Sequence, residues 1–192
     1  MRRSKNWLVA GSMGLLVVGF AAPSAAQDTP KVEVAGGWNY IAARSDADDT
    51  WEHFYKGGFG EVAVNLSDRW GVLGNVAYQQ KTITEVGGDI KVKVIPYLFG
   101  VRFSSRNNEN VTPFAQFLAG ASSLKASQGS DSVDETPFTW QVGGGLNVAV
   151  NDRLGARAGL DYIRIHGTDD GEISGGEAIQ GLRISAGIVV GF

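Results

Sequence analysis

The sequence predicts an all-β protein, an eight-stranded antiparallel up-and-down transmembrane β-barrel, from three observations. Apolar residues alternate with polar or small residues, with a period of two, along eight segments. The connections between these segments alternate between short turns and longer polar loops. Charged residues recur in mid-strand on one face, and the other face is more uniformly apolar, which suits a barrel with a polar interior and a lipid-facing exterior.

The first 26 residues differ from the rest and predict a secretory signal peptide. Three of the first five residues are basic, an apolar stretch follows at 7–22, and small residues precede Gln27. The apolar stretch is shorter than the roughly 20 residues that a membrane-spanning helix needs. Residues 27–192 are then one domain, the barrel.

Composition narrows the class of protein further. The net charge is -3 for the whole chain, and the leader holds three cations and no acids, so the remainder is near -6. An acidic chain without a basic stripe argues against nucleic-acid binding. There is no cysteine, so an exported domain must be stable without disulfides. No apolar run after residue 27 is long enough for a membrane helix, but that test does not detect barrels.

The eight strands follow from reading the sequence in steps of two. The segment FTWQVGGGLNVAV is the clearest, with aromatic and aliphatic residues on one face and polar or small residues on the other. The predicted strands are 31–43, 53–66, 70–82, 91–103, 112–123, 138–150, 154–166 and 179–192. The short turns are 67–69, 104–110 and 151–153, and the long loops are 44–52, 83–90, 124–137 and 167–178.

Two local features within these strands need a specific interpretation. Pro96 cannot donate a hydrogen bond to a ladder, so it predicts a bulge or a locally broken bond. The segment 112–123 is apolar on both faces, and we expect Gln116 to point inward and Phe117 outward.

The polar face supplies the first candidate site, a charge network in the lumen. An eight-stranded barrel has an interior that side chains fill, so buried charges must pair to offset their desolvation. The residues of this network are Glu33, Glu61, Arg102, Arg157, Asp161 and Arg183. The network would either plug the lumen or gate a pore, and the narrow interior favours the plug.

The apolar face carries aromatic residues toward the strand ends, where amphipathic rings favour the membrane interfaces. The predicted interface aromatics are Trp38, Trp70, Tyr78, Phe103, Trp140 and Phe192.

Several stretches together resemble a known family. They are the leader, the eight alternating strands, the turns NLSDRWG and VNDRLGARAGLDY, the pair YLFGVRFSS and PFAQFLAG, and the terminal GIVVGF. In this order they resemble the small eight-stranded outer-membrane barrels, the OmpA/OmpX-like and opacity-type family of the outer membrane protein beta-barrel domain. The resemblance implies a monomer in the outer membrane of a Gram-negative cell envelope, in contact with lipid and lipopolysaccharide.

The resemblance also implies roles for particular residues. In that family a C-terminal Phe with apolar residues at alternate positions is read by the barrel-assembly machinery, which implies an assembly signal of Ile184, Ile188, Val190 and Phe192. A further hypothesis comes from the positions of two lysines and not from the resemblance: Lys91 and Lys93 are expected to point outward just beyond the apolar band and to meet lipopolysaccharide phosphates.

The predicted function is therefore that of an integral outer-membrane barrel with a plugged polar lumen and a structural or surface-interaction role, in envelope integrity or adhesion. We expect no catalysis, cofactor or metal site: His53 and His166 lack a triad-like setting, and the acidic loops lack the spacing of a calcium loop. Two alternatives stay open. One is a soluble lipocalin-like barrel that binds a small apolar ligand, suggested by the G-x-W at 36–38. The other is an outer-membrane enzyme that modifies lipid A, or a narrow pore.

Overall fold

The structure is a computed structural model that describes residues 29–45, 51–85, 88–108, 110–128, 131–167 and 178–192. The predicted leader lies outside the described residues and stays a prediction. The strands are β1 (Val32–Ser45), β2 (Glu52–Phe54), β3 (Lys56–Asn65), β4 (Trp70–Glu85), β5 (Gly88–Ser104), β6 (Val111–Gln128), β7 (Asp131–Glu135), β8 (Phe138–Ala149), β9 (Leu154–Ile165) and β10 (Ile179–Gly191).

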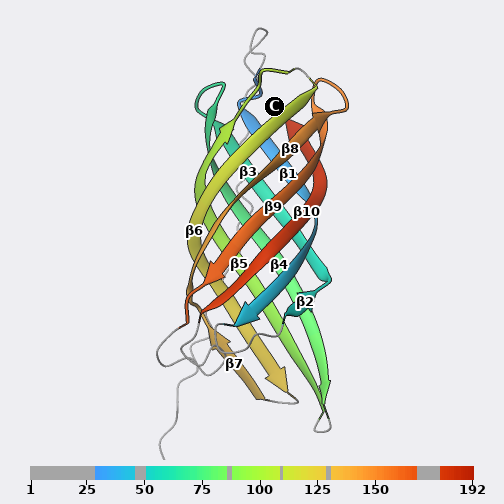
Figure 1. The fold of residues 1–192 in the computed structure, drawn as a ribbon, viewed down its shortest axis with the longest axis vertical. Helices are drawn as coiled ribbons and strands as arrows, with labels where there is room; N and C mark the ends of the chain where they lie inside the picture. Colours follow the sequence, from blue (N-terminus) through green and yellow to red (C-terminus); the bar gives the residue numbers. More distant parts are fainter. Residues whose placement is uncertain (1–28, 46–50, 86–87, 109, 129–130, 168–177) are drawn as a thin grey trace, which may run out of the picture.

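These strands close into an eight-stranded antiparallel barrel (Figure 1), so the predicted fold class is confirmed. Neighbouring strands pair in the order β10-β9-β8-β6-β5-β4-β3-β1, and β10 pairs with β1 to complete the ring. The two short strands add no position to the ring, because β2 pairs with β1 beyond β3 and β7 pairs with β6 beyond β8. The closed ring leaves the barrel wall without a free edge.

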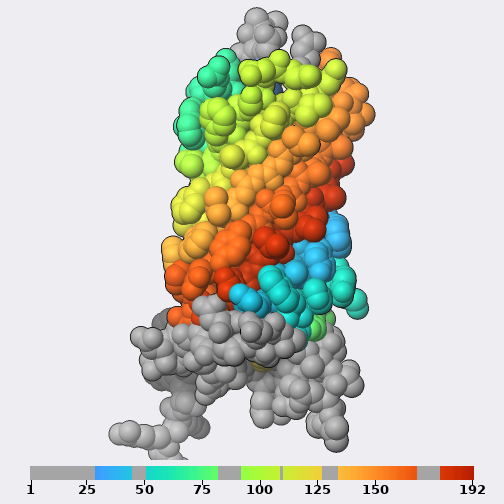
Figure 2. Space-filling model, in the orientation of Figure 1, coloured from blue at the N-terminus to red at the C-terminus, as the bar shows by residue number. Residues whose placement is uncertain are grey.

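The register fixes the tilt of the strands. A path across paired residues runs from Glu33 in β1 through all eight strands and returns to β1 at Ala43, ten residues further on. A shift of this size requires strongly tilted strands, which Figure 1 shows. The small number of strands, eight, keeps the interior narrow enough for side chains to fill. Figure 2 shows the tilted strands covering the outer face of the barrel.

Two predicted loops are largely strand in the structure, and this prediction was wrong. β4 runs to Glu85 and β5 begins at Gly88, and β6 runs to Gln128 with β7 beside it. In Figure 1 these strands project beyond the others at the end opposite the C-terminus. The β-branched residues in KTITE and DIKVKV favour extended backbone. The two strands of a hairpin pair each other's backbone N–H and C=O groups, so a hairpin outside the membrane needs no apolar face toward lipid.

The predicted strand 53–66 is also divided, at Tyr55, into β2 and β3. Trp38 pairs with Gly58, whereas Ile41 pairs with Phe54. The segment from β2 to β3 therefore holds one residue more than the part of β1 opposite it. That count defines a β-bulge. The backbone carbonyl of Tyr55 accepts a hydrogen bond of 3.0 Å from Trp38 Nε1, which gives this unpaired residue a partner.

Pro96 interrupts the β4–β5 ladder, as predicted. Pairing stops after Val76–Tyr97 and resumes at Gln79–Val94 with no change of register, so the ladder is broken without a bulge. The pairing of Pro96 with Ser122 of β6 is kept. The backbone of Pro96 therefore faces β4 on the side where other residues would donate an N–H group.

The two faces of the barrel differ in the way expected in lipid. Trp38 is 48% exposed on the outer face, whereas Glu61 is 5% exposed in the lumen. The inward and outward positions predicted for Gln116 and Phe117 are confirmed. A lipocalin-like barrel would require Trp38 to point inward, so that alternative is wrong. The described residues contain no helix long and apolar enough to cross a membrane, a finding with no bearing on crossing by strands.

Candidate functional site

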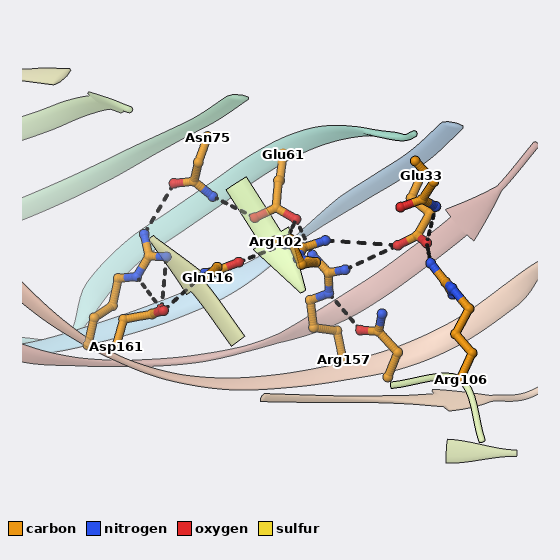
Figure 3. Close-up of polar contacts among 11 residues, drawn as sticks. Glu33, Glu61, Asn75, Arg102, Arg106, Gln116, Arg157 and Asp161 are labelled. Carbon is orange, nitrogen blue, oxygen red and sulfur yellow. Dashed lines mark hydrogen bonds and ion pairs between the residues drawn. The ribbon is translucent and has the colours of Figure 1, made fainter. Parts of the chain in front are cut away.

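The six predicted lumen residues all point into the barrel and are each at most 5% exposed. They come from five strands, β1, β3, β5, β9 and β10. In Figure 3 the side chains of Glu33, Glu61, Arg102, Arg157 and Asp161 point toward one another across the lumen. The alternation along each strand explains the direction of each side chain, and the register places the five strands' contributions close together.

Glu61 is the centre of the network. Its carboxylate forms ion pairs with the guanidinium groups of both Arg102 and Arg157. It also accepts a hydrogen bond of 3.3 Å from Asn75 Nδ2. One buried carboxylate thus compensates two buried cations, so its loss would leave both without their main partner.

A second ion pair joins Asp161 to Arg183, whose Nη2 lies 3.0 Å from Asp161 Oδ2. Two amide side chains connect this pair to Glu61. Arg183 Nη1 donates to Asn75 Oδ1 at 3.2 Å, and Gln116 Nε2 donates to Asp161 Oδ1 at 3.0 Å. The Gln116 carbonyl in turn accepts from Arg102 at 2.8 Å, which makes the network continuous.

Glu33 extends the network toward the short-turn end. Its Oε1 accepts from Arg106 Nη2 at 2.6 Å and from Asn65 Nδ2 at 2.8 Å. Its Oε2 lies 3.6 Å from Arg157 Nη2 and 3.9 Å from Arg102 Nη1. Glu33 therefore links the central pair to the turn that carries Arg106.

The sequence predictions left out several members of this site, among them Arg106 and Phe114. Arg106 lies in the turn after β5, outside any alternating segment, so no periodicity marked it as inward. Phe114 points inward from β6, and the guanidinium carbons of Arg102 and Arg157 lie 4.6 and 5.0 Å from its ring centroid. Phe114 shares the inward face expected for Gln116, but its position in the sequence did not indicate contact with two guanidinium groups. Both additions place a further large side chain in the lumen.

Gly143 makes room for the Asp161–Arg183 pair. A Cβ atom at this position would lie 2.4 Å from Asp161 Oδ1, closer than real contacts allow. A glycine on the lumen face of β8 therefore permits the carboxylate to sit against the barrel wall.

The predicted interface aromatics lie on the outer face. Trp38, Trp70, Tyr78, Phe103 and Phe192 are exposed, and Trp140 is half-buried beside Tyr162. Trp70 and Phe103 form an edge-to-face pair with centroids 5.2 Å apart at the short-turn end. Their contact with the headgroup region stays a prediction.

The two histidines also lie on the outer face, each bonded to an aromatic residue. The Tyr40 hydroxyl lies 2.6 Å from His53 Nδ1, and Trp140 Nε1 donates to His166 Nε2 at 3.1 Å. In the described part of the chain, no group of three or more His, Asp or Glu side chains is placed to hold a metal ion.

The remaining predicted residues whose side chains the structure describes also lie on the outer face. Ile184, Ile188 and Phe192 are exposed on the lipid side of the terminal strand, and Val190 is half-buried there. Lys93 shares the outward face with Tyr97 and is half-buried, while the side chain of Lys91 lies outside the described residues. The assembly and lipopolysaccharide roles of these residues stay predictions.

The apolar exterior, the closed ring of eight strands and the charged interior together define an outer-membrane type of β-barrel. Comparison with known families agrees. The model for the outer membrane protein beta-barrel domain matches residues 13–190, and the chain belongs to this family, as the sequence motifs predicted. The protein is therefore located in the bacterial outer membrane. No curated protein matches the chain in sequence.

Solved structures share the fold at low sequence identity. The Neisserial surface protein A is 13% identical, with a TM-score of 0.68, and the match covers 84% of this chain and 97% of that one. Ail, the attachment invasion locus protein of Yersinia pestis, solved in complex with the heparin analogue sucrose octasulfate, is 19% identical over 84% and 99%, with a TM-score of 0.55. OprG from Pseudomonas aeruginosa is 11% identical over 85% and 96%, with a TM-score of 0.55.

Proposed function

We propose that this protein is a non-conducting and non-catalytic barrel that acts at the cell surface, in adhesion or envelope integrity. The observation that carries the proposal is the network around Glu61, which brings side chains from five strands together in the lumen. Phe114 adds a large side chain at the level of Arg102 and Arg157, and Arg106 adds another beside Glu33 toward the short-turn end. A narrow interior filled in this way leaves no continuous water path for ions.

The projecting strands support the surface role. β4 to β7 continue past the rest of the barrel at the end opposite the short turns, which faces the outside in barrels of this class (Figure 1). Among the solved relatives, Ail is named as an attachment and invasion protein. The projecting hairpins are the part of this chain that a surface partner would meet first.

Planar-bilayer recording tests the plug. The parent protein is expected to show no discrete conductance steps, whereas Arg102→Ala, which shortens a central side chain, is expected to produce small steps. Phe99→Ala is the control, because Phe99 is exposed on the lipid face and plays no part in the network. Conductance steps in the parent, in preparations that shift on unboiled SDS gels as folded barrels do, would rule out the plug.

Contact between Lys93 and lipopolysaccharide phosphates is a second proposal. Lys93 lies on the outward face of β5 near the projecting end and pairs across the ladders with Gln80 and Lys125. An ammonium group there suits a phosphate ligand. Charge reversal at Lys91 and Lys93 together should reduce the lipopolysaccharide that co-purifies with the barrel, with Lys31→Glu, at the opposite end, as the control. An unchanged amount would contradict the proposal.

A further inference from the structure

A cavity of about 80 Å³ lies in the lumen on the loop side of the charge network. Seven strands contribute to its walls: β1, β2, β4, β5, β6, β9 and β10. The wall residues are mostly aliphatic and include Ile41, Leu124, Ile163, Ile165 and Ile179. Leu124, Ile163 and Ile165 pack together as a buried cluster. The same lumen that holds ion pairs at one end is thus apolar at the other.

Buried amides border this cavity on the side of the charge network. Gln79 lines the cavity and is 0% exposed. Its Nε2 donates to Asn39 Oδ1, and Asn39 Nδ2 donates to the carbonyl of Gly58 at 3.3 Å. A Cβ atom at residue 57 would lie 2.2 Å from Asn39 Oδ1, so Gly57 leaves space for both amides. The bonded amides hold this end of the cavity in place and limit its depth.

The ion pair between Lys81 and Glu52 lies beside another part of the cavity wall, at Phe54. Phe54 lines the cavity, and Lys81 Nζ lies 5.8 Å from the centroid of its ring. Lys81 forms an ion pair with Glu52, and both side chains are partly exposed. The cavity is therefore bordered by buried amides on one side and by solvent-accessible charges on another, an arrangement that suits an amphiphile lying with its chain inward and its polar head toward water.

An unfilled apolar cavity inside a protein stays dry and takes up apolar molecules. A cavity of roughly 150 Å³ accommodates benzene, so a space about half that size suits the end of an unbranched chain. The occupant must come from the aqueous side, because the cavity lies within the closed ring and membrane acyl chains meet the outer face. We propose that this cavity binds the chain end of a short aliphatic amphiphile that enters from outside the cell. The proposal is independent of the plug and goes beyond it.

Isoleucine methyl groups provide the readout. The full chain, labelled with ¹³C at the isoleucine methyls, is placed in lipid nanodiscs and titrated with 1-butanol through 1-octanol. Saturable shifts are expected at Ile41, Ile163, Ile165 and Ile179, while the lipid-facing Ile184 and Ile188 report partitioning into the bilayer. Binding should tighten about fourfold for each added methylene until the cavity is full, and then level off. Shifts confined to Ile184 and Ile188, or none at all, would overturn the proposal.

Ala43 and Ala42 provide a matched pair of variants. Ala43 lines the cavity, whereas Ala42, the residue directly before it, faces outward on the same strand. Ala43→Leu should abolish the lumen shifts or limit them to the shortest alcohol, and Ala42→Leu should bind like the parent. Ile165→Val, a conservative change that removes one methylene from the wall, should move the levelling-off point to a longer chain. Binding by Ala43→Leu that equals the parent, or an unchanged profile in Ile165→Val, would count against the site.

Discussion

The two halves of the lumen share four strands, β1, β5, β9 and β10, but are stabilised by different interactions. On β9, Arg157 faces the short-turn half and Ile165 faces the loop half; on β1 the corresponding residues are Glu33 and Ala43. The first half is filled with paired charges, and the second encloses an apolar cavity. Burial alone therefore does not determine which side chains fill a barrel interior. A buried charge is stable only beside its partners, and a buried aliphatic side chain only among other apolar ones.

The difference matters because the two kinds of interior respond differently to a single change. Removing one member of a buried ion pair leaves an uncompensated charge in a place with little water, and the remaining partner cannot relax into solvent. Removing part of an aliphatic side chain leaves a larger void, whose cost depends on how far the surroundings collapse. The half around Glu61 should accordingly be the more sensitive of the two.

The largest effect is expected for Glu61→Gln, which preserves the shape of the side chain and removes its charge. Arg102 and Arg157 then lose the nearer of their two carboxylates and keep only the longer contacts with Glu33. The free energy of unfolding should fall by about 3–5 kcal/mol, the usual cost of breaking a buried pair. Urea unfolding of the barrel in lipid vesicles measures this change.

The exposed pair Lys125–Asp134 is the control for that prediction. Its side chains are 48% and 58% exposed, with the nitrogen and oxygen 3.1 Å apart. Asp134→Ala should cost about 0–1 kcal/mol, because solvent screens such pairs. Equal effects in the two variants would show that the pairs of the lumen are no more demanding than a surface pair, which would contradict the comparison between the halves.

The same contrast explains what the sequence predicted. A period of two assigns Glu33 and Arg157 to the inner face without knowledge of any other strand, and charge on that face requires pairing. The partners were not predictable, because they depend on how neighbouring strands are shifted: Glu61 meets Arg157 only at this register. Arg106 enters from a turn, where no period applies.

The cavity and the projecting hairpins escaped prediction for related reasons. Aliphatic residues on the inner face near the strand ends, such as Ile163 and Ile165, are compatible with either a filled or an unfilled lumen until all eight strands are placed. The segments 83–90 and 124–137 looked like loops because they lack an apolar lipid-facing row, but a hairpin outside the membrane needs none.

A smaller effect is expected on the apolar side, for Leu124→Ala. Leu124 is 2% exposed and packs against Ile163 and Ile165 at the wall of the cavity. A buried leucine-to-alanine change costs about 2–5 kcal/mol, and a cost near the lower end, about 2–3 kcal/mol, is expected because the lost contacts border a space that is already unfilled. The measurement is urea unfolding in lipid vesicles, beside Leu146→Ala on the lipid face, which leaves the cavity unchanged. A cost for Leu124→Ala above that of Glu61→Gln would reverse the order of the two halves and would mean that packing around the cavity, rather than the ion pairs, dominates the stability of the lumen.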